Sequence, residues 1–348
     1  MAKLRSKSKK LSNFENNFDM QMKKTLILFF VFLNSMLVSG QESSSGYNVL
    51  KLPTSSHVAA LGGENVSLIE NDAAIAWHNP ALLANVQSQT LGLSFMTYFA
   101  DSQWMGAQYV RAFGERHTAA IAIQYMNYGS QAETDASGNV LGEFSAKDII
   151  VAPSYSYLLN DKWSGGATLK FASSSYASYS ALALAVDLGL NYYDEERDLS
   201  VSATLKNIGA EVSSFQDQVQ HLPFVAQVGF SKGLSHLPLR ISVTMTDLTR
   251  WSSRYYYIAE EEKEKLSFSK KLLNHFVVGA DYFLSKNIYL SAGYNFRRAY
   301  ELKAANSAHG AGFSFGGGLN LSKFSISASY AKYHKAQASL MFNASYTF

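Results

Sequence analysis

The side chains that most often carry catalysis or hold metals are widely scattered in this chain of 348 residues. It contains no cysteine, and none of its eight histidines lies four residues from another on a predicted helix or belongs to a His-Glu-x-x-His motif. Because metal sites draw on closely spaced histidine, cysteine and carboxylate groups, we expect neither a catalytic metal nor another cofactor. The histidines are His57, His78, His117, His221, His236, His275, His309 and His334.

The glycine run Gly316-Gly317-Gly318 is not a phosphate-binding loop, because no helix and no Lys-Ser or Lys-Thr pair follows it. Within a strand, such glycines mark a bend or close packing. Hydrolases embedded in membrane barrels, with serine or aspartate and histidine at the rim, remain an alternative, but no local motif supports one. The sequence therefore predicts a protein that is not an enzyme.

Several charged residues lie on the polar faces of segments that we expect to be strands. In a barrel such residues point into the lumen, where they form ion pairs or contact water. This interpretation is favoured over a substrate path through the lumen, which stays open as the alternative. The residues are Lys170, Asp187, Lys206, Asp247 and Asp281.

A tyrosine-rich segment lies on a long predicted loop. Arg254, Tyr255, Tyr256 and Tyr257 are followed by the charged run 260–265. Exposed tyrosines beside charges suit contact with another protein, so this loop is a candidate partner site. The alternative is a solvated loop whose tyrosines belong to an interfacial aromatic girdle.

The elements that must position these residues show hydrophobic alternation with period two. In one example, Phe324, Ile326, Ala328 and Tyr330 alternate with three serines. Only 16% of the residues are charged, against about a quarter in soluble proteins, and 14% are aromatic. A β-sandwich could also produce alternation. Many runs reach ten residues, however, and soluble strands average about five or six, so the pattern favours a membrane barrel.

About fourteen such runs can be counted, which predicts an all-β, transmembrane antiparallel barrel. They are 87–101, 102–113, 117–129, 142–158, 162–176, 178–194, 196–210, 222–233, 237–248, 272–285, 286–299, 308–321, 322–334 and 335–348.

The connections between these runs alternate in length. Short periplasmic turns and longer external loops are typical of bacterial outer-membrane barrels, whereas a sandwich would have no reason to alternate. The short ones are 114–116, 160–161, 194–196, 233–238, 285–286 and 321–322, and the long ones are 130–141, 210–221, 249–271 and 298–307.

The last predicted strand ends the chain on an aromatic residue. Apolar side chains occupy every second position, and the pattern resembles the C-terminal signal by which the barrel-assembly machinery recognises its clients. The residues that carry this signal are Phe342, Tyr346 and Phe348, together with Leu340 and Ala344.

The chain divides into three predicted parts. Residues 1–40 form an N-terminal extension and signal peptide, with an apolar run over 25–38 and small residues before a cleavage site near Gly40 or Gln41. A genuine membrane anchor is the alternative. Residues 41–86 form a hatch inside the barrel, and residues 87–348 form the barrel. We therefore expect export to the outer membrane of a Gram-negative bacterium. With a net charge of +3 and no basic stripe, nucleic acid is not an expected partner.

The hatch differs from the rest because it combines turn chemistry with short helical patterns. Its motif residues are Leu61, Gly62 and Gly63, which allow a tight turn or close backbone approach, and Asn79, Pro80 and Ala81, which suit the start of a helix.

Strings in the hatch carry a resemblance to a known family. The segments Tyr47–Pro53, Ala59–Asn65, Asn71-Asp72 and Asn79–Leu83 resemble the PorQ family of outer-membrane components of the type IX secretion system of Bacteroidetes. Ala-Leu-Gly-Gly and Asn-Pro-Ala are shared with the wider family of barrels similar to long-chain fatty-acid transporters, which includes PorV. The resemblance covers nearly all of the predicted mature chain.

The resemblance implies a scaffold that anchors partners of the cell-surface attachment complex. Those partners would be PorZ, with PorU and PorV, at a membrane that carries lipopolysaccharide. No catalytic residues transfer, because catalysis in that system belongs to PorU. The alternative is a channel or transporter for hydrophobic solutes, similar to the long-chain fatty-acid transporters, with the hatch as a gate.

Overall fold

The chain forms a closed antiparallel β-barrel of fourteen strands, preceded by a segment of short helices. The computed structural model describes residues 47–348 except 135–136, 138, 178, 216–218, 254–255, 257–265, 305–309 and 335–336. The predicted signal peptide therefore lies outside the described residues. The prediction of a fourteen-stranded antiparallel barrel is confirmed.

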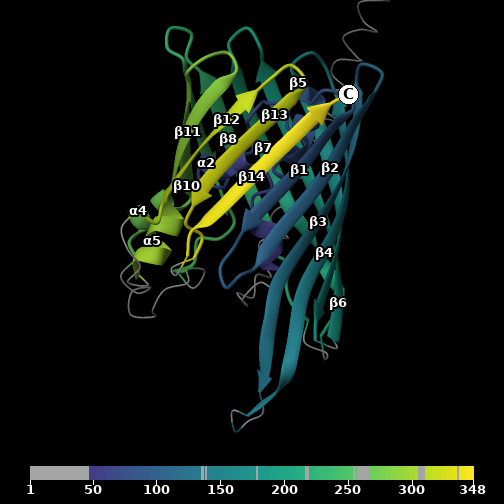
Figure 1. The fold of residues 1–348 in the computed structure, drawn as a ribbon. Helices are drawn as coiled ribbons and strands as arrows, with labels where there is room; N and C mark the ends of the chain where they lie inside the picture. Colours follow the sequence, from purple (N-terminus) through teal and green to yellow (C-terminus); the bar gives the residue numbers. More distant parts are fainter. Residues whose placement is uncertain are drawn as a thin grey trace, which may run out of the picture. The chain divides into compact units, whose positions relative to one another are not determined.

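Each strand pairs with its neighbours in the sequence, and β1 pairs with β14 to close the barrel (Figure 1). The strands are β1 (Thr90–Thr97), β2 (Gln103–Phe113), β3 (His117–Thr134), β4 (Val140–Leu158), β5 (Trp163–Tyr176), β6 (Tyr179–Asp194), β7 (Leu199–Ser213), β8 (Val225–Gly233), β9 (Leu239–Met245), β10 (Phe276–Phe283), β11 (Ile288–Asn295), β12 (Phe313–Asn320), β13 (Phe324–Ala331) and β14 (Ser339–Thr347).

The alternation in the sequence separates an apolar outer wall from a polar inner wall. Leu93, Phe315 and Phe342 face outward and are 54%, 51% and 48% exposed, whereas Ser314 and Ser329 face inward and are buried. A continuous apolar exterior of this kind is stable only against lipid, so the barrel is a membrane-spanning one. No helix among the described residues is long and apolar enough to cross a membrane.

The two ends of the barrel differ. The end that carries Phe348 has short connections such as 114–116, and we call it the turn end. The opposite loop end carries longer connections and the helices α4 (Phe268–Asn274) and α5 (Phe296–Ala304). The predicted strand ends 272–275 and 296–299 are therefore wrong, because these residues lie in or directly after helices at the rim.

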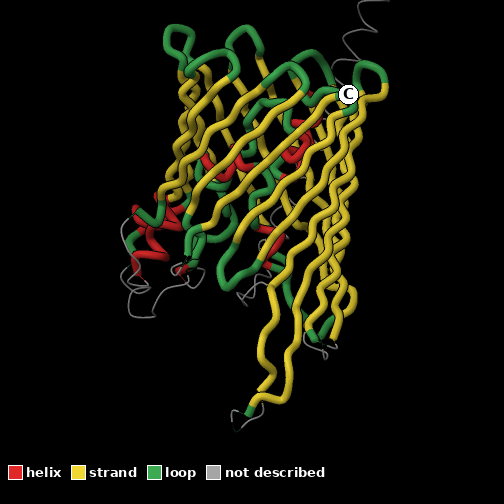
Figure 2. The backbone as a smooth tube through the Cα atoms, in the orientation of Figure 1, coloured by secondary structure: helices red, strands yellow, loops and turns green. Residues whose placement is uncertain are grey.

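The longest excursion at the loop end is made of strand rather than loop. β3 continues to Thr134 and β4 begins at Val140, so the predicted loop 130–141 was wrong over most of its length. Residues 130–134 and 140–144 pair only with each other, because β2 ends its pairing with β3 at Asn127 and the last backbone contact of β4 toward β5 is the Ser145 carbonyl, which accepts the Ala177 N–H. We call this two-stranded projection the ribbon; it extends beyond the other connections in Figure 2.

The described part of the hatch, residues 47–86, lies inside the lumen. It contains η1 (Asn48–Lys51), α2 (Ser56–Ala60), η2 (Ala73–Trp77) and η3 (Pro80–Asn85). α2 packs against β11 to β14, η2 against β1 to β3, and η3 against β3 to β6. The hatch therefore touches the wall on several sides.

Local hydrogen bonds explain why this short segment keeps its shape. The Ser55, Asp72 and Asn79 side chains each accept a backbone N–H at the start of a helix, which satisfies donors that the helix itself leaves open. The predicted helix start at Asn79-Pro80 is confirmed, as a 3-10 helix. Gly62 and Gly63 adopt φ values of +108° and +90°, which L side chains rarely adopt.

Inward-facing glycines of the wall make room for the hatch backbone. A Cβ on Gly293 would overlap the backbone of Leu61 and Gly62, and a Cβ on Gly166 would lie 2.5 Å from the carbonyl carbon of Pro80. A single amide completes the fit: Asn343 of β14 accepts the Ser56 N–H at 2.8 Å and donates to the Thr54 carbonyl (3.1 Å) and the Ser94 hydroxyl of β1 (2.8 Å).

Candidate functional site

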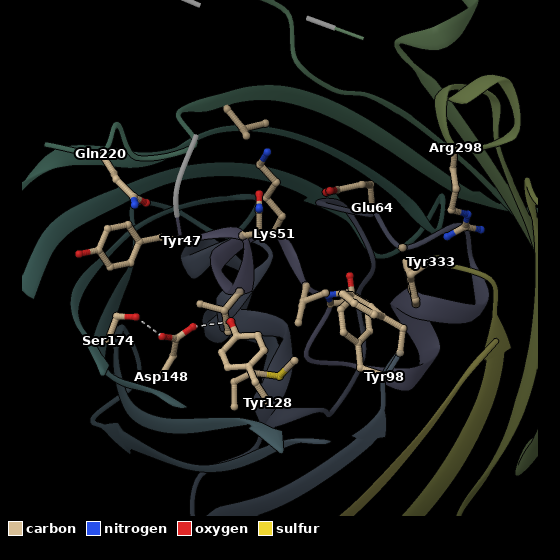
Figure 3. Close-up of a pocket in the computed structure, with 18 of the residues that line it drawn as sticks. Tyr47, Lys51, Glu64, Tyr98, Tyr128, Asp148, Ser174, Gln220, Arg298 and Tyr333 are labelled. Atoms are coloured by element: carbon tan, nitrogen blue, oxygen red, sulfur yellow. Dashed lines mark hydrogen bonds between the residues drawn. The ribbon is translucent and has the colours of Figure 1, made fainter. Parts of the chain in front are cut away.

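A large cavity opens at the loop end of the barrel, above the hatch. Its volume is about 1030 Å³, and we call it the vestibule. Residues 47–53 and 62–64 of the hatch form its floor, and strand ends and loops form its wall (Figure 3). Tyrosines from both are prominent in the lining: Tyr47, Tyr98, Tyr128, Tyr176, Tyr179 and Tyr333.

One side of the vestibule combines apolar groups with a carboxylate that is held by hydroxyls. Asp148 accepts hydrogen bonds from Tyr128 at 2.6 Å and from Ser174 at 2.5 Å (Figure 3). The Tyr47 hydroxyl donates to Glu211 at 2.8 Å. Below them, Met126 is buried but reaches the lining. The hydroxyls of Tyr47 and Tyr128 are thus each held by a carboxylate.

The opposite side is basic, but its arginines are engaged. Arg297 pairs with Asp247 at 2.9 Å and with Glu301 at 2.8 Å. Arg298 is buried and donates to the Gly62 carbonyl at 3.4 Å and to carbonyls of the chain before β12. Burial lowers the pKa of Lys51 to about 8, and Arg297 adds to the effect. Around neutral pH the floor of the vestibule therefore holds a cation that is easily neutralised.

Below the vestibule, a buried histidine joins the hatch to the barrel wall. His57 of α2 contacts Glu70 through Nδ1 at 2.6 Å and Asp281 of β10 through Nε2 at 2.8 Å. Asp281 also pairs with Arg240 of β9 at 2.8 Å, and the His57 ring stacks on Tyr289 with centroids 4.2 Å apart. Strands β10 and β11 and two parts of the hatch therefore meet at this imidazole, and β9 is joined to it through Asp281.

The charge state of His57 should make hatch seating depend on pH. Burial alone lowers its pKa, but the Glu70 and Asp281 carboxylates outweigh burial and raise the pKa to about 9. Because the folded pKa lies above the ordinary value of about 6.5, the protonated ring stabilises the seated hatch. That contribution is complete below about pH 6.5 and is lost as the pH rises through 9.

Asp72 titrates at lower pH, since burial and then Glu70 raise its pKa to about 6. Its titration is nearly complete by pH 7. Between pH 7 and pH 10 the loss of the His57 proton should therefore loosen the hatch by roughly 2.5 kcal/mol, counting about 1.4 kcal/mol for each pKa unit. Lys51, whose pKa is lowered to about 8, acts in the opposite direction over the same range, because loss of its proton relieves the cost of burying its charge. Cleavage of residues 47–86 by proteinase K, followed by mass spectrometry, measures this. The difference in hatch stability between the unchanged chain and His57→Gln isolates the His57 contribution and should shrink as the pH rises from 7 to 10. A difference that stays constant over this range would contradict the assignment.

The predicted lumen charges are buried on the inner face and most are ion-paired. Lys170 and Asp187 are fully buried, with Nζ 2.6 Å from Oδ2, and Lys170 also lies 3.8 Å above the Trp77 ring of η2. Asp247 and Asp281 pair with the arginines described above, and Lys206 is buried on β7. The interpretation as an ion-paired lumen is confirmed for these pairs. In the described part of the chain, no cluster of three or more histidine, aspartate or glutamate residues could hold a metal ion.

The candidate partner loop is only partly visible. Arg254, Tyr255 and Tyr257 lie outside the described residues. Tyr256 is 2% exposed and packs edge-on against Tyr300 of α5, so the expectation of an exposed tyrosine was wrong at this position. Helices α4 and α5 bury Tyr256, and no pattern in the neighbouring sequence predicts this burial.

The other predicted residues fall at two places. Leu61, Gly62, Gly63, Asn79, Pro80 and Ala81 are buried between the hatch and the wall, with Gly62 and Gly63 also reaching the vestibule floor. Phe342, Tyr346 and Phe348 lie on the outer face at the closing strand, 48%, 41% and 63% exposed. Sequence reasoning missed Asp148, His57 and Arg298, because their partners come from distant strands and helices.

The structure shares its fold with several solved outer-membrane proteins. The toluene transporter TodX of Pseudomonas putida aligns with a TM-score of 0.55 at 12% identity, covering 85% of this chain and 99% of that one. A Pseudomonas aeruginosa FadL homologue aligns at 0.51 and 12% identity, covering 85% and 98%. The monoaromatic hydrocarbon channel CymD aligns at 0.53 and 13%, covering 86% and 98%.

No protein-family model matches the chain, and no curated protein sequence matches it. Identities of 12–13% establish a shared fold and nothing about ligands. The chain therefore has the fold of outer-membrane barrels of the FadL type, with a hatch-filled lumen and a vestibule at the loop end.

Proposed function

We propose that this protein lies in an outer membrane and admits small hydrophobic or amphipathic solutes through the vestibule, with the hatch as its gate. The observation that carries the proposal is the vestibule itself. A cavity of about 1030 Å³ is large enough for a small organic molecule, and it combines apolar surface with a few placed polar groups. Solved proteins of the same fold are described as a toluene transporter and a monoaromatic hydrocarbon channel, which is consistent with this use.

Filling the vestibule from its β3 wall should block entry. The test is uptake of radiolabelled toluene, and separately of a medium-chain fatty acid, by cells that lack their own transporters for these solutes. The intact chain should raise uptake several-fold over an empty vector, and Met126→Trp should remove most of that gain. Ile123→Trp is the matched control, because Ile123 is 50% exposed on the outer face of the same strand. Uptake no higher than the empty vector would refute the proposal.

A second candidate function is the anchoring of a surface protein, as the type IX secretion resemblance implies. The observation that favours it is the ribbon, which projects at the loop end with two unpaired strand edges. Val140 and Leu141 are 69% and 66% exposed there. Unpaired edges with apolar neighbours are suited to adding a strand from another chain.

Deletion of the ribbon separates this candidate from a solute channel. Removing residues 130–145 should abolish co-purification of a PorZ-like partner from the outer membrane while leaving solute uptake unchanged. Removing residues 252–268 instead tests the tyrosine-rich loop. A partner retained at full yield in both variants would exclude these surfaces as its docking sites.

A further inference from the structure

We propose that water and solute pass the hatch along one side only, through a seam between η2 and strands β1 to β4, while the rest of the hatch stays attached to the wall. The solute part of this inference rests on the proposed function. The hydration of the seam does not.

The hatch is tied to most of the barrel by side-chain hydrogen bonds. Strands β8 to β14 supply the majority of these ties, and Ser156 of β4 and Ser164 of β5 hold the Ala81 carbonyl. The ties on the β8 to β14 side are Ser231 to Ser67, Gln227 to Glu64, Arg240 to the Ile69 carbonyl, Asp281 to His57, Asn295 to the Gly62 carbonyl, Ser314 to the Ala60 carbonyl, Ser327 to Ser56 and Asn343 to Ser56.

The side facing β1, β2 and β3 has no such ties. Within the described residues, no hydrogen bond of residues 54–86 reaches these three strands. Alanines meet there instead: Ala73 and Ala74 of η2 face Ala120, Ala122 and Ala152 of the wall around a cavity of about 10 Å³. Apart from Trp77 of η2, the side chains here are small and provide few van der Waals contacts, so this part of the interface rests on apolar packing without polar attachment.

Two glutamines aim unpartnered amides into this cavity. Gln108 of β2 and Gln124 of β3 are 3% and 2% exposed, and neither the amide nitrogen nor the amide oxygen of either has a hydrogen-bond partner among the described residues. Buried amides are nearly always satisfied, and a cavity of roughly 10–15 Å³ accommodates one water molecule. The geometry therefore assigns these amides to water, and to the polar groups of a passing solute.

The seam lies next to the vestibule along β3. Gln124 lies two positions along β3 from Met126, which lines the vestibule, so the two cavities are about 7 Å apart along the strand. Met126 is cross-strand partner to Trp104 of β2, and both side chains are buried. This Met–Trp pair is the apolar barrier between vestibule and seam.

Single cysteines test the seam, because the natural chain has none. A small cationic methanethiosulfonate reagent is applied to the folded full-length protein carrying Gln124→Cys, Ala122→Cys or, as the matched control on the tied side, Ser67→Cys. The seam cysteines should react at least 10-fold faster than Ser67→Cys, and Met126→Ala should speed the reaction at Gln124→Cys further. A faster-migrating band before boiling shows that each variant is folded. Equal rates on both sides, or a faster control, would overturn the hydrated seam.

Uptake then separates this inference from the function on which it rests. Reagent bound at Gln124→Cys should block toluene uptake, and reagent bound at Ile123→Cys on the lipid face should not. Uptake that survives full modification of Gln124→Cys overturns the seam as the solute route but leaves the proposed function standing. Absence of uptake in the unmodified protein overturns the proposed function and the solute route, and the labelling rates still decide whether the seam is hydrated.

Discussion

Replacing Gly293 with valine should unseat the hatch while leaving the barrel folded. The new Cβ would overlap the backbone of Leu61 and Gly62 and would lie 2.7 Å from the Ala60 carbonyl oxygen. Overpacking that side chains can absorb costs about 1–3 kcal/mol. Here the three nearest atoms are all backbone atoms of the hatch, so we expect the upper part of that range or more. The hatch should lose its seat on β11 and β12, since its turn cannot move without breaking the neighbouring hydrogen bonds.

Limited proteolysis measures this effect. Proteinase K should cut within residues 47–86 of Gly293→Val at least 10-fold faster than in the unchanged chain, while the unboiled barrel keeps its fast migration. Gly142→Val is the matched control, because a Cβ at Gly142 of β4 meets nothing within 4 Å. Equal cleavage in the two variants would show that close backbone approach at β11 does not hold the hatch.

The second large effect is expected at the fully buried ion pair. Lys170→Met removes the counter-ion of Asp187, the hydrogen bond to Asn207 (2.8 Å) and the cation above Trp77. Breaking a buried pair from one side typically costs roughly 3–5 kcal/mol, because the remaining charge is left buried without its counter-ion. Urea unfolding of the refolded barrel, followed by tryptophan fluorescence, should show a loss of that size.

The double variant Lys170→Met with Asp187→Leu distinguishes charge from packing. Removing both charges should recover most of the lost stability, since well-packed apolar groups often replace a buried ion pair without loss. If the double variant is less stable than the single one, the pair is not the source of the effect. Recovery of stability should stay incomplete, because Asp187→Leu removes the acceptor of the Asn207 N–H, which donates to Asp187 at 2.7 Å.

The barrel could be predicted because strand periodicity is local. Alternation such as that from Phe324 to Tyr330 can be recognised from neighbouring residues alone, and short turns separate one run from the next. The ribbon was not predicted because residues 130–141 are mostly polar. A polar strand outside a membrane has no apolar face, so it shows no hydrophobic alternation in the sequence. At Phe296 the alternation of β11 ends in α5, because the strand has reached the rim and the lipid no longer imposes a period of two.

The site could not be predicted in the same way. The partners of Asp148 come from β3 and β5, and those of Arg298 come from the hatch and the chain before β12. These contacts depend on barrel register and on where the hatch settles, which no local pattern encodes. The Gly62-Gly63 pair could be recognised in the sequence. Its close packing against Gly293 could not be predicted, because it depends on how the hatch lies against β11.

The amide of Asn343 has a consequence for the order of folding. It joins the hatch, the first strand and the last strand, and its bond to the Ser56 N–H closes a loop of 287 residues. Such a contact forms late, because the entropy of closing so long a loop must be offset by structure already present. The segment that leads the barrel in the sequence should therefore be the last to find its place. The lumen would then be closed only when assembly is complete, and an incompletely assembled barrel would be permeable.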